Sequence, residues 1–415
     1  MRRTPLDAAP RNMTVETGKT RTGPWTPRTT AQLAILAAAA FIYATAEILP
    51  VGALPAISAG LGVSEALVGT LLAWYAVVAA ATTIPLVRWT AHWPRRRVLL
   101  VTLVCLTTSQ VISAMAPSFA VLAGGRALCA VTHGLMWSVL APIATRLVPP
   151  SHSGRATTAI YVGTSLALVV GIPLTSAMSL LWGWRLAVVV ITVAAAAITV
   201  AARFALPALV LSTDQLALVG RHHYRNRRLL GVSTLMLIAV TGHFVSYTFI
   251  AVIIEDVVGV PGARLAWLLA AFGAAGLVAM SMLARLLDHH PKAVTGGCMA
   301  ALSAAFVVLA ALSIGGEHTT GTAAVGAAAI VLWGAMAMAV SPMLQSAAMR
   351  TAPDDPDGAS GLYVTAFQVG ITGGSLAGGL LFEWAGTSAM LSASALLVGV
   401  TAVGVAASKR LFVVP

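Results

Sequence analysis

The sequence predicts an all-α membrane protein of twelve transmembrane helices, arranged as two pseudo-symmetric halves of six. The first observation is the composition, because 58% of the 415 residues are hydrophobic and only 9% are charged. The second is a series of apolar runs of about 20 residues, the length that a helix needs to cross a bilayer core of roughly 30 Å. The third is a long polar gap that divides the runs six and six. A soluble domain would not expose so much apolar surface.

The apolar runs define the predicted spans. Each begins and ends where polar, charged or Pro/Gly-rich sequence interrupts the hydrophobic run, and each is long enough to cross the bilayer as a helix. The predicted spans are residues 32–57, 65–87, 98–116, 119–145, 157–181, 184–206, 229–254, 264–287, 292–314, 322–349, 359–382 and 386–408.

Positive charge is concentrated in alternate gaps between the spans. Of the 25 Lys and Arg residues, only Arg185 and Arg264 lie at the span ends that border the opposite gaps, and only Arg126 lies deep inside a span. Cytoplasmic loops carry the excess of positive charge in membrane proteins, so both termini are predicted to be cytoplasmic. The net charge of +12 is therefore a topology signal, and we expect no nucleic-acid partner.

The longest internal gap separates the halves, and the two halves resemble one another. Trp93-Pro94-Arg95 follows the second span, and His290-Pro291-Lys292 stands at the matching place in the second half. Six plus six spans with a related loop in each half suggest a duplicated transporter. The predicted units are a disordered cytoplasmic tail at 1–30 that is not a cleaved signal, an N-terminal half at 31–206, a cytoplasmic linker at 207–228, a C-terminal half at 229–408 and a cytoplasmic tail at 409–415.

Several other function classes lack their sequence signatures. Cys105, Cys129 and Cys298 are odd in number, lie in apolar spans and have no metal-ligand spacing, so neither a disulfide nor a metal site is predicted. Residues 18–20 resemble the end of a phosphate-binding loop, but Met13 stands where that loop requires its first glycine. We therefore expect no enzyme, no cofactor and no ATP site, which leaves an ion gradient as the energy source.

Few ionisable side chains lie inside the predicted spans and away from their ends: Glu47, Arg126, His133 and His243. Such a group in hydrocarbon costs about 2.5 kcal/mol or more, so each normally faces a cavity or a partner. Arg126 and His133 are two helical turns apart and share one face. Glu47 is the hardest to explain without a function, whereas a structural role remains open for the other three.

Three segments carry a family resemblance. They are residues 43–50 around Glu47, Arg126 with residues 133–138, and the fifth-span segments 163–167 and 171–174 followed by residues 183–185. Together they resemble the major facilitator superfamily over about residues 30–410. Within it they look most like the twelve-span drug:proton antiporter branch, and closest to its sugar-efflux transporters.

The resemblance implies a role for several of these residues. Gly163, Gly171 and Pro173 match the antiporter motif, which implies export. Glu47 would be the principal proton carrier, with His133 as a modulator and Arg126 as a charge partner. A buried carboxylate beside a cation can bind and release a proton as access alternates between the two sides.

The loop after the second span departs from the family pattern. The family places an Asp where Ala91 stands here, and only the basic end of the motif survives. The corresponding loop of the second half, after the eighth span, keeps an acid, Asp288, and a base, Lys292. The predicted cytoplasmic gate residues are Arg95, Arg96, Asp288 and Lys292, and gating that relies on a first-half acid remains open.

Polar and aromatic residues within the spans are the candidates for substrate binding, since such sites are mostly apolar with a few placed polar groups. We expect a monomeric, proton-coupled exporter of sugars or drugs in a bacterial cytoplasmic membrane, with the small molecule, protons and lipid as its partners. An uptake symporter, or less readily a membrane sensor, is the alternative. The predicted substrate-binding residues are Tyr43, Trp137, Ser138, His243, Tyr247, Gln345 and Gln368.

The charge asymmetry makes a prediction about orientation. A membrane-impermeant thiol reagent applied to intact cells should label a single cysteine placed in the gap at 315–321 but not one placed at 221–228. Labelling after permeabilisation controls for reactivity. The reverse pattern of labelling would contradict the predicted topology.

Overall fold

The computed structural model describes residues 25–209, 226–260, 263–316, 319–408 and 411–412. All regular structure in these ranges is helical. The tail predicted at 1–30 and the linker predicted at 207–228 lie largely outside the described residues. The elements are α1 (Pro27–Gly52), α2 (Leu54–Leu61), α3 (Glu65–Trp89), α4 (Arg95–Ala114), α5 (Phe119–Arg146), η1 (Pro150–His152), α6 (Ser153–Leu166), η2 (Ala167–Gly171), α7 (Ile172–Trp182), α8 (Trp184–Ala205), α10 (Arg227–Tyr247), α11 (Ile250–Val252), η4 (Ile253–Val257), α12 (Ala263–His289), α13 (Pro291–Gly315), α14 (Thr320–Thr351) and α15 (Pro356–Ala407).

The described helices confirm an all-α membrane fold. Eleven helical stretches are long and apolar enough to cross a bilayer. The longest, α15, is interrupted at Gly386, whose φ of 80° lies outside the helical region and is accessible mainly to glycine. This break divides α15 into two membrane-length helices, so the described chain makes twelve crossings, close to the predicted positions.

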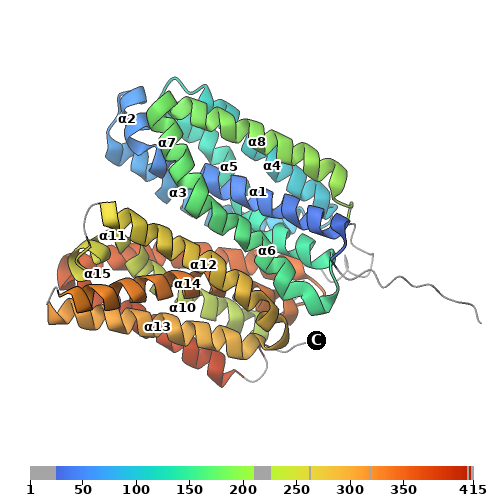
Figure 1. Ribbon diagram of the computed structural model, residues 1–415. Helices are drawn as coiled ribbons and strands as arrows, with labels where there is room; N and C mark the ends of the chain where they lie inside the picture. Colours follow the sequence, from blue (N-terminus) through green and yellow to red (C-terminus); the bar gives the residue numbers. More distant parts are fainter. Residues whose placement is uncertain (1–24, 210–225, 261–262, 317–318, 409–410, 413–415) are drawn as a thin grey trace, which may run out of the picture.

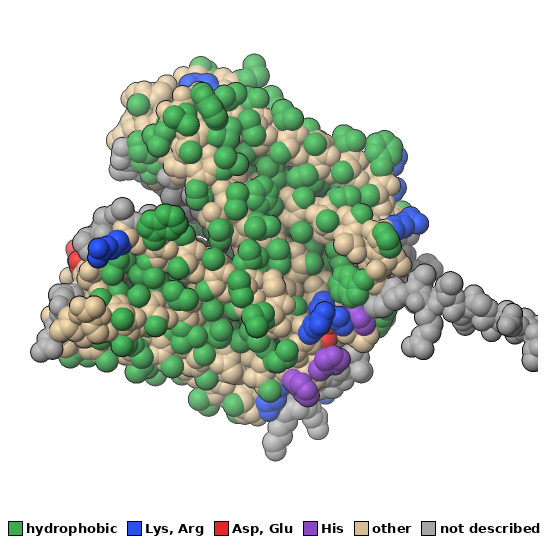
Figure 2. All heavy atoms as spheres, viewed as in Figure 1, with side chains coloured by type: hydrophobic (Ala, Val, Ile, Leu, Met, Phe, Trp, Pro, Cys, Tyr) green, Lys and Arg blue, Asp and Glu red, His purple; other side chains and the backbone are tan. Residues whose placement is uncertain are grey.

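The helices form two bundles (Figure 1). Residues 33–206 of α1–α8 enclose one hydrophobic core, and residues 229–412 of α10–α15 and the segment after it enclose another. The bundles meet where α15 packs against α3 and α5 and where α12 packs against α6. They converge at the end where α6 begins, here called the closed end, and separate at the end that carries α2 and α11, here called the open end. Figure 2 shows the surface hollowed between the bundles at the open end.

Glycines of the predicted antiporter motif lie where α1 meets the fifth span. A Cβ atom on Gly163 would overlap the backbone carbonyl of Ala37, and one on Gly171 would overlap the side chain of Thr45. Between these two glycines the helix widens into the π-helical turn η2. Such turns interrupt regular helical hydrogen bonding and are frequent at functional sites. The motif therefore brings the fifth span into backbone contact with the helix that carries Glu47.

This contact makes a prediction about stability. Gly163→Ala should lower the free energy of unfolding by about 1–3 kcal/mol, because the overlapping atom is backbone and cannot rotate away. Gly124→Ala is the matched control, since a Cβ there meets nothing within 4 Å and alanine favours the helix. Thermal unfolding in detergent measures both, and equal stability of the two variants would contradict the packing argument.

Candidate functional site

Glu47 lies on α1 one turn before Pro50, and Arg126 of α5 holds the backbone there. Pro50 has no N–H, so the carbonyl of Ala46 has no helical donor. The guanidinium of Arg126 donates to that carbonyl at 3.1 Å and to the backbone carbonyl of Glu47 at 2.7 Å. Arg126 is buried. It therefore places a positive charge beside Glu47 while binding the backbone of α1, and both of these hydrogen bonds are to backbone carbonyls and not to the carboxylate.

His133 lies next to the Glu47 carboxylate. Its Nδ1 atom is 3.7 Å from Oε2 of Glu47, which is too long for a hydrogen bond. The same Nδ1 lies 3.1 Å from the hydroxyl of Tyr75, a fully buried residue of α3. That hydroxyl also contacts the thiol of Cys129 at 3.2 Å. The Arg126 guanidinium lies over the Tyr75 ring at 5.4 Å. Tyr75 is thus central to the cluster although the sequence did not single it out.

Glu47 is more exposed than its neighbour. Its side chain is 20% exposed, whereas that of His133 is 4% exposed. A carboxyl group that is partly accessible and lies beside a buried imidazole and a buried guanidinium can exchange a proton with water without moving far.

A series of aromatic rings leads from His133 to the other half. The ring centroid of Trp137 lies 6.2 Å from that of His133 and 6.3 Å from that of Tyr161 on α6. The Tyr161 hydroxyl donates to that of Tyr363 on α15 at 3.5 Å. Trp137 and Tyr161 are partly exposed. These rings connect the Glu47 cluster to the second bundle.

The second bundle holds an aromatic cluster of its own. His243 stacks on Tyr247 at 4.9 Å, and its Nδ1 accepts a hydrogen bond of 2.9 Å from the indole of Trp333. Phe272 and Phe306 pack against Trp333. Donation by Trp333 requires Nδ1 to be unprotonated, so His243 is held as a neutral hydrogen-bond acceptor with one partly exposed face.

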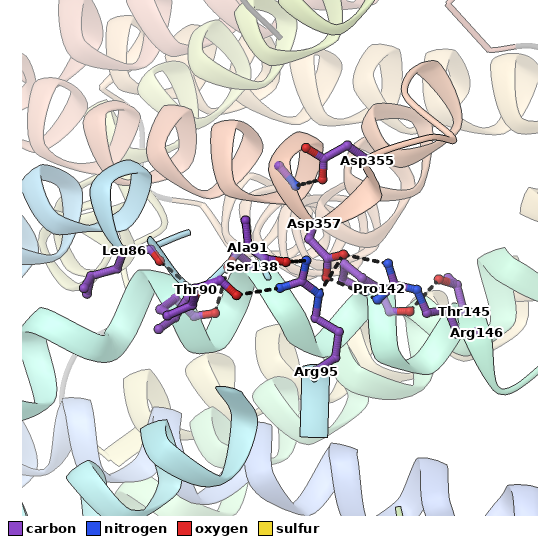
Figure 3. Close-up of polar contacts among 12 residues, drawn as sticks. Leu86, Thr90, Ala91, Arg95, Ser138, Pro142, Thr145, Arg146, Asp355 and Asp357 are labelled. Atoms are coloured by element: carbon purple, nitrogen blue, oxygen red, sulfur yellow. Dashed lines mark hydrogen bonds and ion pairs between the residues drawn. The ribbon is translucent and has the colours of Figure 1, made fainter. Parts of the chain in front are cut away.

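At the closed end, Asp357 joins the halves through two arginines (Figure 3). Asp357 begins α15 and is buried. Its Oδ2 lies 3.1 Å from Nε of Arg95 at the start of α4, and 2.6 Å from Nη2 of Arg146 at the end of α5. Arg95 also donates to the backbone carbonyl of Ala91 at 3.0 Å. Arg95, which remains from the family's loop motif, therefore pairs with Asp357, an acid of the other half.

Asp288 makes the corresponding junction on the other side. It ends α12 and accepts from Nε of Arg155 at 2.8 Å and from the backbone N–H of Gly154 at 2.7 Å, both at the start of α6. Arg350, at the end of α14, lies 4.0 Å from the same carboxylate. The two junctions occupy matching places in the two halves, but acid and base are exchanged. In one the loop supplies Arg95 and the helix start Asp357, and in the other the loop region supplies Asp288 and the helix start Arg155.

The other predicted site residues lie in several environments. The hydroxyl of Tyr43 donates to the carbonyl of Cys129, that of Ser138 to Leu135, and the amide of Gln345 to the hydroxyl of Ser360. Gln368 is buried on α15.

Arg96 donates to the carbonyl of Leu206 within its own half, and Lys292 is partly exposed beside His289 and His290. The geometry brings Glu47, Arg126 and His133 together, whereas Arg96 and Lys292 lie apart from the two ionic junctions.

Sequence reasoning missed Tyr75, Asp357, Arg146 and Arg155 as members of these clusters. Arg146 and Arg155 contributed only to the charge asymmetry of the loops, and Asp357 was not among the predicted residues. A search for an acid at the start of the eleventh span, prompted by the missing acid at position 91, would have found Asp357. No sequence signal pointed to Tyr75, because its partners come from another helix.

The comparison with protein families is decisive for the fold and the general activity. The sequence model of the family described as the Major Facilitator Superfamily matches residues 36–374 of this chain. The chain belongs to the major facilitator superfamily. It is therefore a multi-pass membrane transporter of small molecules, as its sequence predicted.

Relatives and solved structures agree with this assignment. A chloramphenicol efflux pump of Mycobacterium tuberculosis strain H37Rv is 67% identical over 404 residues, which cover 96% of this chain and 98% of that protein. The corresponding pump of strain CDC 1551 is equally similar. Among solved structures, the Escherichia coli fucose:proton symporter has a TM-score of 0.71 at 16% identity, covering 90% of this chain and 97% of that chain. An outward-facing bacterial homologue of ferroportin has a TM-score of 0.71 at 13% identity, covering 92% and 99%.

The ionic junctions make a prediction about closure. Asp357→Asn leaves the buried Arg95 without its counter-charge, and removal of one partner of a buried pair costs roughly 3–5 kcal/mol. Spin labels at positions 151 and 289, both exposed at the closed end on opposite halves, should report a larger population of long distances. Asp354→Asn, which removes the same charge from an exposed neighbour, should keep the wild-type distribution. An unchanged distribution in Asp357→Asn would contradict a closing role.

Proposed function

We propose that this transporter is a proton-driven exporter of chloramphenicol and similar amphipathic drugs, acting as a monomer in a bacterial cytoplasmic membrane. The observation that carries the proposal is the partly exposed Glu47 carboxyl group beside His133 and Arg126. The relatives at 67% identity are chloramphenicol efflux pumps, which favours drugs over sugars as the cargo.

The closed end is proposed to be cytoplasmic. It carries Arg95, Arg146, Arg155 and Arg350, whose gaps hold the excess of positive charge. The open end then faces outwards, so Glu47 is accessible to external protons in this conformation. Both termini lie on the cytoplasmic side in this orientation.

Coupling follows from the charge of Glu47. In the outward-open conformation the carboxylate takes up a proton and becomes neutral. After the transporter has opened inwards, the proton leaves to the cytoplasm and a drug molecule binds, its hydroxyl or amide donors bonding to the carboxylate. Re-exposure of an empty site would bury an unpaired carboxylate, which is costly. The transporter therefore changes conformation only with a proton or a drug molecule bound at Glu47. Each change from outward-open to inward-open brings one proton into the cytoplasm.

The drug is proposed to bind between the two aromatic sets. Trp137 and Tyr161 line the N-terminal half, and His243 and Tyr247 line the C-terminal half. Ring faces on both sides suit a flat aromatic group, and the neutral His243 supplies a polar contact. Tyr43, Ser138, Gln345 and Gln368 remain proposed members of the polar surroundings, with their hydrogen bonds fixing the shape of the site rather than reaching the drug.

The gate is proposed to be the pair of ionic junctions. Asp357 is bound across the halves by Arg95 and Arg146, and Asp288 by Arg155, and both junctions must separate when the cytoplasmic side opens. Asp357 supplies the acid that the loop lacks at Ala91. Lys292 and Arg96 remain proposed as accessory charges of the same loops.

The coupling proposal predicts the behaviour of Glu47→Gln. The amide keeps the size and hydrogen bonding of the carboxyl group but cannot carry a proton. In proteoliposomes with an imposed proton gradient, the variant should lose uphill chloramphenicol transport, with at least a tenfold lower accumulation. It should retain drug binding and downhill exchange.

His133→Gln serves as the matched comparison, because it changes a neighbour without removing the carrier. It should alter the pH dependence of transport and leave uphill accumulation measurable. If Glu47→Gln still concentrates the drug against its gradient with wild-type pH dependence, Glu47 is structural and the coupling scheme is wrong.

A further inference from the structure

We propose that Tyr75 is a positioning residue that keeps the proton on Glu47 releasable, by holding His133 neutral through a hydrogen bond to its Nδ1 atom. This inference rests on the proposed role of Glu47. It concerns a residue that makes no contact with Glu47 within hydrogen-bond distance and acts through the imidazole between them.

The geometry shows two groups at one nitrogen. Nδ1 of His133 is 3.1 Å from the Tyr75 hydroxyl and 3.7 Å from the Glu47 carboxylate. A neutral imidazole nitrogen without hydrogen has one lone pair and accepts one strong hydrogen bond. In the described conformation Tyr75 lies within hydrogen-bond distance of Nδ1, whereas Glu47 does not.

The direction of the hydrogen bond follows from the surroundings of Tyr75. The residue is fully buried, so its O–H proton needs an acceptor within the protein. The two neighbours are Nδ1 of His133 and the thiol of Cys129 at 3.2 Å. Sulfur is a weak acceptor and an imidazole nitrogen is a strong one, so Tyr75 donates to His133. His133 then carries its single ring proton on Nε2.

The consequence for coupling concerns how tightly the site retains its proton. If Nδ1 were free, the protonated Glu47 carboxyl group could donate to it or transfer its proton to it. Either arrangement stabilises the proton-loaded pair and hinders release to the cytoplasm. Because Tyr75 occupies Nδ1, the carboxyl proton of Glu47 has no acceptor on His133. The proton is then held less tightly and can leave when access changes.

The other titratable and charged groups around His133 are accounted for on each packed element. They are Glu47 and Tyr43 on α1, Tyr75 on α3, and Arg126 and Cys129 on α5. Tyr43 donates to the carbonyl of Cys129 and contacts Thr132, so its hydroxyl is engaged with α5 and not with the imidazole. Arg126 lies over the Tyr75 ring and keeps the charge environment of Glu47 constant when only the hydroxyl is removed.

The test is the pH dependence of proton-driven chloramphenicol uptake into inside-out proteoliposomes. Tyr75→Phe removes the hydroxyl and keeps the ring beneath Arg126. The midpoint of its pH profile should move to higher pH by about half a unit to one unit, the size expected for one gained hydrogen bond. In a His133→Gln background the same substitution should cause no further shift, because Tyr75 acts through the imidazole.

Tyr363→Phe is the matched control. Tyr363 is as deeply buried as Tyr75, but its hydroxyl donates to the backbone carbonyl of Ser341 and not to the imidazole of His133. The substitution should leave the pH midpoint of transport in place. An equal shift in both tyrosine variants would overturn the inference.

Two further arms keep the result interpretable. A fluorinated tyrosine at position 75 keeps the fold and is a stronger donor, so the midpoint should move to lower pH even if Tyr75→Phe fails to fold. If the midpoint of the fluorinated protein does not move, or moves to higher pH, the proposed role of Tyr75 is wrong. Glu47→Gln in the same assay separates the two proposals. If Glu47→Gln is uncoupled and the Tyr75 variants leave the pH midpoint unchanged, only the inference about Tyr75 fails. If it remains fully coupled, the proposed function fails as well.

Discussion

Two buried carboxylates form ion pairs across the interface between the halves and favour the described conformation of this transporter. Asp357 pairs with Arg95 and Arg146, and Asp288 pairs with Arg155. Asp357 and Asp288 are almost fully buried and are neutralised only where the bundles meet. A buried charge without its partner is strongly unfavourable, so these junctions hold the closed end together. The bundles converge at this end and separate at the open end (Figure 1). Alternating access requires that these pairs be broken and then re-formed, so each charge must regain water or a new partner when the closed end opens.

The same constraint explains how the proposed proton site is built. Glu47 lies inside a span, where an unpaired carboxylate is costly, and Pro50 one turn later opens the helical hydrogen bonding beside it. Arg126 uses that opening to bring a positive charge to the backbone of α1 without forming an ion pair that would fix Glu47 in its charged form. His133 and Tyr75 supply the polar surroundings on the other side. A carboxyl group in these surroundings can alternate between its two protonation states, which is what coupling requires.

Much of the fold followed from the sequence, because a bilayer imposes simple requirements on length and polarity. The spans, the division into halves and the meeting of Glu47, Arg126 and His133 could be predicted, since helical periodicity places Arg126 and His133 on one face. The partners that cross between helices could not. Arg95 was read as a gate residue, but its acid lies far away in the chain at Asp357, and Arg146 and Arg155 served only as topology signals. In the sequence, nothing distinguishes Tyr75 or Trp333 from other aromatic residues in the spans. Their hydrogen bonds to His133 and His243 appear only in the structure. Such contacts depend on the packing of distant segments, which no local pattern encodes.

The central claim is that drug and proton move in opposite directions through one site. It is tested most directly by measuring proton movement when only a chloramphenicol gradient is imposed across proteoliposome membranes. The internal pH is followed with a trapped dye, in the absence of any initial pH difference. The account predicts that drug leaving the lumen drives protons into it, and that Glu47→Gln removes this movement. Proton flow in the same direction as the drug, as in a symporter, or drug flow without any proton movement would contradict it.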